Sequence, residues 1–124
     1  MSGLDLKNFQ PKRGAIADFD FGSALGSQTE KIKPCVVVTN DVYNSRLIVV
    51  QVVPITQFSE KKARVVTNVT LDATEQNGLN KKSIADCLQT RLIDYPNRFI
   101  KYRGIIESEL LTKIDKALAI VFDI

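Results

Sequence analysis

Residues 34–56 read PCVVVTNDVYNSRLIVVQVVPIT and contain two apolar runs separated by a polar segment. The runs at residues 35–39 and 47–55 are rich in valine and isoleucine, whose β-branched side chains suit a pleated, packed surface. Both runs are therefore predicted to be buried strands. In the segment between them, Asn40 or Asp41 can accept a hydrogen bond from a free backbone N–H and begin a helical turn.

The second run ends in Pro54-Ile55-Thr56. Proline has no N–H to give to a sheet ladder, so Pro54 is expected at a strand end or edge. Thr56 then lies at the mouth of a rigid strand, next to a loop. A polar side chain at that place either takes part in chemistry or simply caps the strand, and the pattern alone leaves both open.

The length of 124 residues fits a single domain spanning residues 1–124, with residues 1–12 as a flexible arm. Hydrophobic residues make up 44% of the chain and charged residues 25%, which is normal for a packed globular protein. No apolar run approaches the roughly 18 residues that span a bilayer. The N-terminal residues lack the apolar region of a secretory signal, so we expect a cytoplasmic protein with no membrane contact.

The chain contains no histidine and only two cysteines, Cys35 and Cys87. A Ser-His-Asp or Cys-His pair is therefore excluded, and a zinc site or other cofactor is not expected. The cysteines are predicted to be buried free thiols rather than a disulfide. An acid–base enzyme built from this chain would use carboxylates, Lys, Arg, Tyr or groups of its substrate. The net charge of +3 permits an anionic partner such as RNA without requiring one.

The remaining segments predict a small all-antiparallel architecture with one helix. Strands are expected at residues 15–21, 63–72, 83–89 and 100–106, with an irregular segment after residue 89 and a turn or short helix at 95–99. Residues 22–33 form a long loop, and Lys31 and Lys33 at its exit are either solvated charges or contacts for an anion. A helix begins near Ser108 and carries an apolar stripe at helical spacing. Five or six short strands and a final helix indicate a small barrel or curled sheet.

Several short motifs, taken in order, resemble the MazF/PemK family of toxins. They are PKRG at 11–14, FDF at 19–21, a following Gly-Ser, KPCVVVTNDVYN from Lys33, VVPIT at 52–56, QTRLID at 89–94 and the final amphipathic helix. No single piece is specific, but the order and spacing over residues 11–122 are. The resemblance implies a mainly β fold, an SH3-like small barrel of the MazF/PemK (CcdB-like) type with added helices, which forms a homodimer.

The resemblance also implies an activity. Members are toxins of type II toxin–antitoxin pairs and act as sequence-specific, metal-independent endoribonucleases on single-stranded mRNA. The RNA's own 2′-hydroxyl is the nucleophile, and the products are a 2′,3′-cyclic phosphate and a 5′-hydroxyl. The implied partners are single-stranded RNA and an antitoxin protein. The alternative is a non-catalytic toxin or binding protein of the same fold, of the gyrase-binding type or a degenerate member.

Site residues are carried over position by position. Lys33 stands where the family has an arginine that contacts the scissile phosphate, so the charge is kept and the bidentate fork is lost. Thr56 matches the family threonine that orients the phosphate or the 2′-hydroxyl. Lys33 and Thr56 are therefore the expected catalytic residues. Gln89 and Arg91 match a recurring Gln-x-Arg that lines the RNA groove, although Arg91 could instead pair with a carboxylate such as Asp94.

Other positions depart from the family pattern. Gln28 replaces a glutamate that often follows Gly-Ser, and Gln28 and Lys31 are expected to contact RNA. In one branch an arginine and an aspartate flank the cysteine before Gln-x-Arg; here those places hold Asp86 and Leu88, so that acid–base pair is not transferred. Family positions also include Asn40, Asp41 and Asn44, for which helix capping is an equal explanation.

Overall fold

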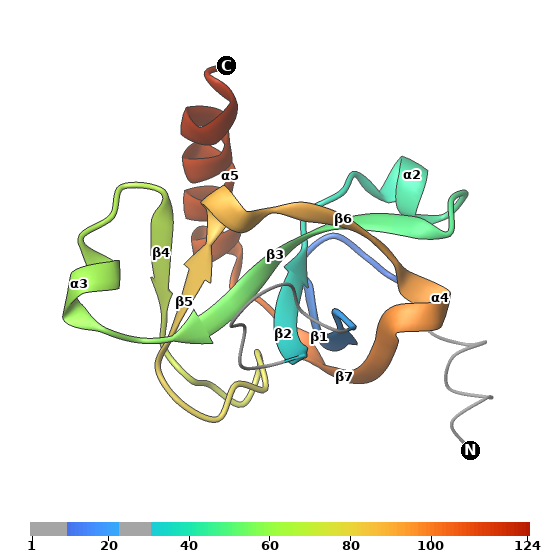
Figure 1. Cartoon of the computed structure of the whole chain (residues 1–124), viewed down its shortest axis with the longest axis horizontal. Helices are drawn as coiled ribbons and strands as arrows, with labels where there is room; N and C mark the ends of the chain where they lie inside the picture. The colour runs from blue at the N-terminus through green and yellow to red at the C-terminus, as the bar shows by residue number, and fades with distance from the viewer. Residues whose placement is uncertain (1–9, 23–30) are drawn as a thin grey trace.

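A computed structural model describes residues 10–22 and 31–124, and its main element is a seven-stranded antiparallel sheet (Figure 1). The elements in chain order are β1 (Ala15–Asp20), β2 (Ile32–Val37), α2 (Asp41–Asn44), β3 (Val49–Gln57), α3 (Glu60–Ala63), β4 (Asn68–Leu71), β5 (Ser83–Asp86), the 3-10 turn η1 (Cys87–Gln89), β6 (Arg91–Asp94), α4 (Tyr95–Arg98), β7 (Phe99–Ile105) and α5 (Ser108–Phe122). The expected mainly β, SH3-like small barrel with a C-terminal amphipathic helix is confirmed.

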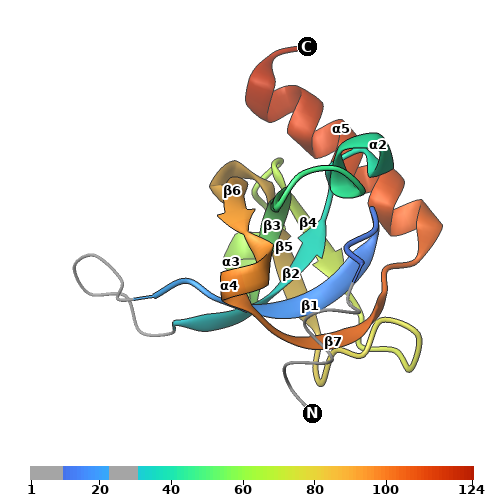
Figure 2. The ribbon, with the colours of Figure 1, turned by 90° about the vertical axis from the view of Figure 1, so that its right-hand side faces the viewer.

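The long strand β3 joins the two parts of the sheet. The strand order is β4-β5-β3-β2-β1-β7, and β6 also pairs with β3. Figure 1 shows β3 crossing the middle of the molecule, and Figure 2 shows β1 and β7 curving side by side. The first part of β3 pairs with β2 and β6, whereas its last three residues pair with β5. β3 therefore pairs with three other strands, more than any other strand of the sheet.

Side chains of β3 contribute to two hydrophobic clusters because successive residues of a strand point to opposite faces. Val53 and Ile55 belong to the first cluster, which is covered by α5 through residues such as Ile114. Val50 and Val52 belong to the second cluster, which is built around Phe19 and Phe99. The apolar stripe predicted for the final helix is confirmed, since its residues pack on the first cluster: Leu111, Ile114, Leu118 and Val121.

The expectation that Pro54 ends its strand or lies at an edge is wrong. Pro54 is buried inside β3, opposite Cys35 of β2. On the other side of β3, pairing with β6 stops at Val52 and pairing with β5 begins at Ile55. The missing N–H of Pro54 thus falls where β3 changes partner, and no ladder hydrogen bond is lost there.

Two segments differ from the sequence-based prediction. The strand expected from residue 63 begins only at Asn68, because the Ser59 hydroxyl accepts the Lys62 N–H and starts the helix α3. Val66, inside the expected strand, is exposed. The strand expected at 83–89 ends at Asp86, and the segment expected to be irregular after residue 89 forms β6, which pairs with β3.

Several local predictions are confirmed. Asn40 caps α2 by accepting the Val42 N–H at 2.8 Å. Cys35 and Cys87 are buried free thiols. Residues 95–98 form the short helix α4.

Part of the expected arm and long loop lies outside the described residues, namely residues 1–9 and 23–30. Pro11 at the end of the arm is buried, and Lys33 at the end of the loop already belongs to β2. No helix in the described ranges has the length and apolar character needed to cross a membrane.

Candidate active site

The pairing of β2 with β3 brings Lys33 and Thr56 together. Cys35 pairs with Pro54, and the same antiparallel register continued by two residues places Lys33 opposite Thr56. Both residues line one pocket of about 330 Å³ at the end of the β2–β3 pair. The two residues expected to be catalytic are thus neighbours in space although they are far apart in the chain.

The pocket is lined by polar and cationic side chains. Its lining residues are Lys33, Pro34, Ile55, Thr56, Gln57, Lys62, Lys81 and Ser83. Three of these are lysines and two carry hydroxyl groups, and no carboxylate is among them. Cations gathered in a hollow without acidic partners produce a positive potential that favours an anion. The pocket is suited to bind a phosphate group.

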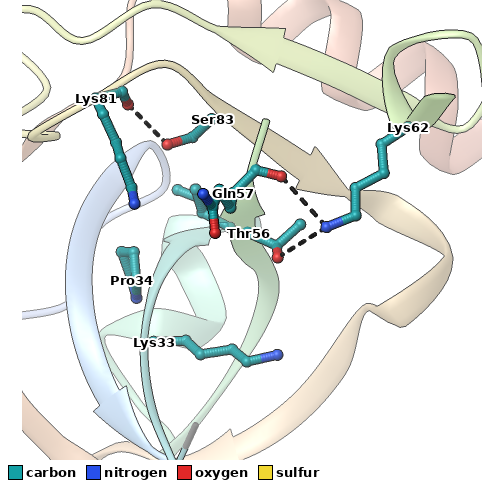
Figure 3. A pocket seen from close by; sticks show the side chains of 8 residues that line it. Lys33, Pro34, Thr56, Gln57, Lys62, Lys81 and Ser83 are labelled. Atoms are coloured by element: carbon teal, nitrogen blue, oxygen red, sulfur yellow. Dashed lines mark hydrogen bonds between the residues drawn. The ribbon is translucent and has the colours of Figure 1, made fainter. Parts of the chain in front are cut away.

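Thr56 lines the pocket and is held in place by backbone pairing. It pairs with Ile84 of β5 and is half-buried. The Lys62 ammonium donates to the Thr56 hydroxyl oxygen at 3.4 Å and to the Gln57 carbonyl at 3.3 Å (Figure 3). The position of the hydroxyl is therefore set by the pairing of β3 with β5 and by the Lys62 ammonium.

Lys33 and Lys81 enter the pocket from other parts of the chain (Figure 3). Lys33 is half-buried in β2 and pairs with Phe19 of β1. Its ammonium forms no ion pair with any described residue. Lys81 precedes β5, and its carbonyl accepts a hydrogen bond from the Ser83 hydroxyl at 2.8 Å. The three lysines thus come from β2, from α3 and from the approach to β5.

Arg91 lies along the sheet from this pocket, outside its lining. In β6 it pairs with Val52, four residues before Thr56, which is roughly 13 Å along a strand. Its guanidinium carbon lies 4.7 Å from the centroid of the Phe21 ring. The Arg91 side chain is exposed and makes no ion pair with Asp94 within the described residues. Asp94 instead accepts hydrogen bonds from Asn97.

Cys35 is buried in β2, two residues after Lys33, and the charges around it affect the pKa of its thiol. Burial raises the pKa of Cys35 far above its ordinary value, and the Asp18 charge adds to this. The charges of Lys33 and Arg91 oppose the increase. The strand register gives the same picture. Lys33 and Cys35 lie on one face of β2, and Arg91 reaches that face because it pairs with Val52, which pairs with Val37.

The remaining predicted site residues are not part of the pocket. Lys31 and Gln89 are exposed, and neither lines it. Gln28 lies outside the described residues. Leu88 is 67% exposed, and its neighbour Asp86 is half-buried.

The polar residues of α2 form a structural network. Asp41 accepts the Arg13 N–H at 2.7 Å, and this bond, together with one from Asn44, lowers the pKa of the Asp41 carboxyl. Asn44 also donates to the Thr39 carbonyl. Capping and loop fixation account for these side chains. Over residues 10–22 and 31–124, no cluster of His, Cys, Asp and Glu side chains is arranged to hold a metal ion.

Sequence reasoning missed Lys62, Lys81 and Ser83. Lys62 lies in the polar stretch QFSEKK at 57–62 and Lys81 in the polar stretch before Ser83, and neither stretch carries a motif that marks a site. The Ser59 capping hydroxyl was a usable signal for α3. Nothing in the sequence indicates which of the neighbouring lysines turns toward Thr56.

Comparison with known proteins gives the family of this chain. A family model described as "PemK-like, MazF-like toxin of type II toxin-antitoxin system" matches residues 12–122. Endoribonuclease EndoA of Bacillus subtilis (strain 168) is 29% identical over 109 residues, which covers 88% of this chain and 91% of EndoA.

Solved structures show the same fold. Mycobacterium tuberculosis toxin MazF-mt6 has a TM-score of 0.70 at 24% identity and covers 89% of this chain and 97% of its own. MazF from Deinococcus radiodurans has a TM-score of 0.77 at 18% identity; the match covers 94% of this chain and 100% of the Deinococcus chain. The family match extends over nearly the whole chain, as the order of motifs predicted, and this chain belongs to the PemK-like, MazF-like toxins of type II toxin–antitoxin systems.

Proposed function

We propose that this chain is the toxin of a toxin–antitoxin pair and acts as a sequence-specific endoribonuclease on single-stranded RNA. Family membership and the similarity to an endoribonuclease support this activity. The observation that carries the proposal is the pocket in which the Thr56 hydroxyl lies among lysines and no carboxylate. Such a pocket fits the phosphate at which RNA is cut.

The reaction uses a nucleophile supplied by the RNA. The 2′-oxygen attacks the adjacent phosphorus as the 2′-hydroxyl loses its proton, and the bond from phosphorus to the 5′-oxygen breaks. The 5′-oxygen takes up a proton, so the products are a 2′,3′-cyclic phosphate and a 5′-hydroxyl. Because attack is intramolecular, orientation and charge stabilisation supply much of the acceleration. This chemistry is compatible with a chain that contains no histidine.

Lys33 and Thr56 are the proposed catalytic residues. The Lys33 ammonium stabilises the negative charge that develops on the pentacovalent phosphate. The Thr56 hydroxyl orients a phosphate oxygen or the 2′-hydroxyl. Both side chains line the pocket from neighbouring strands, which supports a shared role.

The RNA on either side of the cut is proposed to follow the positive face of the sheet. Arg91 and Gln89 are exposed near one end of it, and Lys31 is exposed at the start of β2. Gln28 belongs to the same proposed set. Single-stranded RNA is recognised by stacking on aromatic or guanidinium planes and by base-edge hydrogen bonds, which this surface can provide.

The functional assembly is proposed to be a cytoplasmic homodimer that is inhibited by an antitoxin. One of the similar structures is an endoribonuclease in complex with its cognate antitoxin from a mycobacterial species, with a TM-score of 0.69 at 20% identity. Large apolar side chains exposed on this chain support association; they include Leu47, Ile48, Leu92, Ile100 and Ile105. Exposed apolar surface of this kind commonly marks a protein interface.

The test is cleavage of a long RNA in EDTA, with the 5′-hydroxyl ends mapped. We expect cuts at one short recurring sequence, and we expect an RNA with a single 2′-deoxy substitution immediately 5′ of the cut to resist. Cleavage of the deoxy-substituted RNA would mean that an external nucleophile is used. Varied long RNAs that all stay intact with folded protein would favour the non-catalytic, gyrase-binding type of toxin or a degenerate binding protein.

A further inference from the structure

Lys62 is the residue that contacts the Thr56 hydroxyl. Its ammonium lies 3.4 Å from the Thr56 hydroxyl oxygen and 3.3 Å from the Gln57 carbonyl oxygen (Figure 3). An ammonium group has three donors and no acceptor. Two donors are directed to Thr56 and Gln57, which leaves the third available to a ligand in the pocket.

The backbone around Lys62 is fixed by side chains on both sides. The Ser59 hydroxyl accepts the Lys62 N–H at 3.1 Å, and the Asn68 amide donates to the Lys62 carbonyl at 3.0 Å. The helix α3 has only four residues, which is far too short to be stable without such contacts. The hydrogen bonds from β4 and from the cap therefore hold this helical turn where Lys62 reaches the pocket.

The neighbouring lysine shows that this placement is selective. Lys61 lies in the same turn, is exposed and does not line the pocket, whereas Lys62 is half-buried. Lys62 forms no ion pair with a carboxylate in the part of the chain that the structure describes. A half-buried cation whose partners are a hydroxyl and a carbonyl retains most of its charge for an anion.

The direction of the hydrogen bond determines what Thr56 can do. Because the ammonium can only donate, the Thr56 oxygen must accept, and the hydroxyl proton then points away from Lys62. Lys33 and Lys81 line the same pocket from other elements, so a proton turned away from Lys62 can point to a ligand held among the three lysines. The Thr56 hydroxyl is thus prepared to donate to a phosphate oxygen.

We infer that Lys62 is the positioning residue of the RNA cleavage site, an inference that rests on the function proposed above. It orients the Thr56 hydroxyl as a donor to the scissile phosphate. The contribution of Lys62 to the rate therefore passes through Thr56. A lysine that only attracts RNA would act independently of Thr56.

The experiment is a double-mutant cycle on single-turnover cleavage of one RNA. The variants are Lys62→Met, which keeps the aliphatic stem, Thr56→Val, and the two combined. Lys61→Met is the matched control because it removes the same charge from the same turn. RNA affinity is measured separately by fluorescence anisotropy with the 2′-deoxy RNA, and thermal unfolding checks each variant.

Lys62→Met should lower the rate at saturating RNA by about 10- to 100-fold, the scale for loss of a hydrogen bond to a charged group. Lys61→Met should cleave at the wild-type rate. In the Thr56→Val background, Lys62→Met should lower the rate further by less than about threefold, since residues that act through one another are not additive. Lys62→Arg should restore part of the rate. If Lys62→Met proves unstable, Lys62→Gln takes its place in the same cycle.

Two results would overturn the inference while leaving the proposed function intact. One is a double variant whose rate falls by the product of the factors measured for Lys62→Met and Thr56→Val alone, because the two residues would then act independently. The other is weaker affinity for the 2′-deoxy RNA with an unchanged rate at saturation, which would make Lys62 a simple contact to the RNA backbone. If the wild-type protein cuts no RNA, the proposed function fails, and this inference fails with it.

Discussion

The guanidinium of Arg91 lies over the ring of Phe21, with the central carbon 4.7 Å from the ring centroid. This contact joins β6 to the residue that follows β1, and it places an aromatic ring beside the guanidinium. Arg91 remains exposed. An exposed guanidinium beside an aromatic ring can also stack on an RNA base.

Arg91→Ala is expected to weaken RNA binding and leave the single-turnover rate at saturation unchanged. The variant also loses one positive charge. If that charge counts as one neutralised phosphate, the slope of log affinity against log salt should become about 0.7 less steep. Arg91→Lys should keep the salt slope but bind RNA more weakly, because lysine has no planar group to stack on a base. Titrations of a 2′-deoxy RNA at several salt concentrations measure both quantities. An unchanged affinity in Arg91→Ala would assign Arg91 to packing on Phe21 alone.

Thr56→Val is expected to reduce cleavage by about 10²-fold, the scale for loss of one donor to a transition state. Valine keeps the shape of threonine, so the fold should remain. Thr70→Val is the matched control, because Thr70 in β4 and Thr56 in β3 both pair with Ile84 and only Thr56 lines the pocket. Single-turnover rates of both variants measure the effect on cleavage, and their melting temperatures show whether the fold is kept. Equal rates for the two variants would remove Thr56 from the mechanism.

Lys33→Ala is expected to reduce cleavage by about 10²-fold, because a positive charge at the transition state is lost. Lys33→Arg should keep or raise the activity, since arginine restores a fork that can bind two phosphate oxygens. Lys101→Ala, which removes an exposed charge from β7, serves as the control for net charge. Wild-type cleavage by Lys33→Ala would return Lys33 to the role of a solvated charge.

The chain is expected to form a two-fold dimer at micromolar concentration. Exposed apolar side chains on several elements would be covered in such an assembly. Light scattering coupled to size exclusion gives the mass directly, for comparison with 13.8 kDa for one chain. A mass of one chain over the whole concentration range would exclude a groove shared between two subunits.

The two thiols are expected to be unreactive in the folded protein. Burial raises the pKa of Cys35, and it raises the pKa of Cys87 to about 12, with the nearby Asp86 and Asp115 charges adding to the effect. Because the thiolate is the reactive species, alkylation should stay slow from pH 7 to about pH 9 and become fast only in denaturant. Mass spectrometry after iodoacetamide treatment follows the reaction. Rapid native labelling at pH 8 would contradict this burial.

The central strands and the final helix could be predicted because each is specified locally. Valine-rich runs fit a buried sheet, and the apolar stripe with Ile114 fits one face of a helix. Asn40 was identified as a possible cap because a side-chain oxygen there meets a free N–H. In each case the signal itself, a run of β-branched residues, an apolar repeat or a capping oxygen, lies within a short stretch of sequence.

Pro54 and Lys62 could not be predicted for the opposite reason. Pro54 is tolerated inside β3 only because β6 ends and β5 begins beside it, which is a property of two distant segments. Lys62 enters the pocket because Asn68 and Ser59 fix its turn, and the sequence does not distinguish it from Lys61. Family resemblance supplied Lys33 and Thr56 and said nothing of the lysines around them.

Thr56 belongs to β3, which supplies residues to both hydrophobic clusters, as β1 and β2 also do. Displacing β3 would expose apolar residues of both clusters at once, so opening this strand costs more free energy than opening a surface loop. Many ligand sites are built on loops that open easily, whereas Thr56 is placed in this pocket by a central strand. An inhibitor therefore has little to gain from loosening the site, and a partner protein that silences it has to act by covering it.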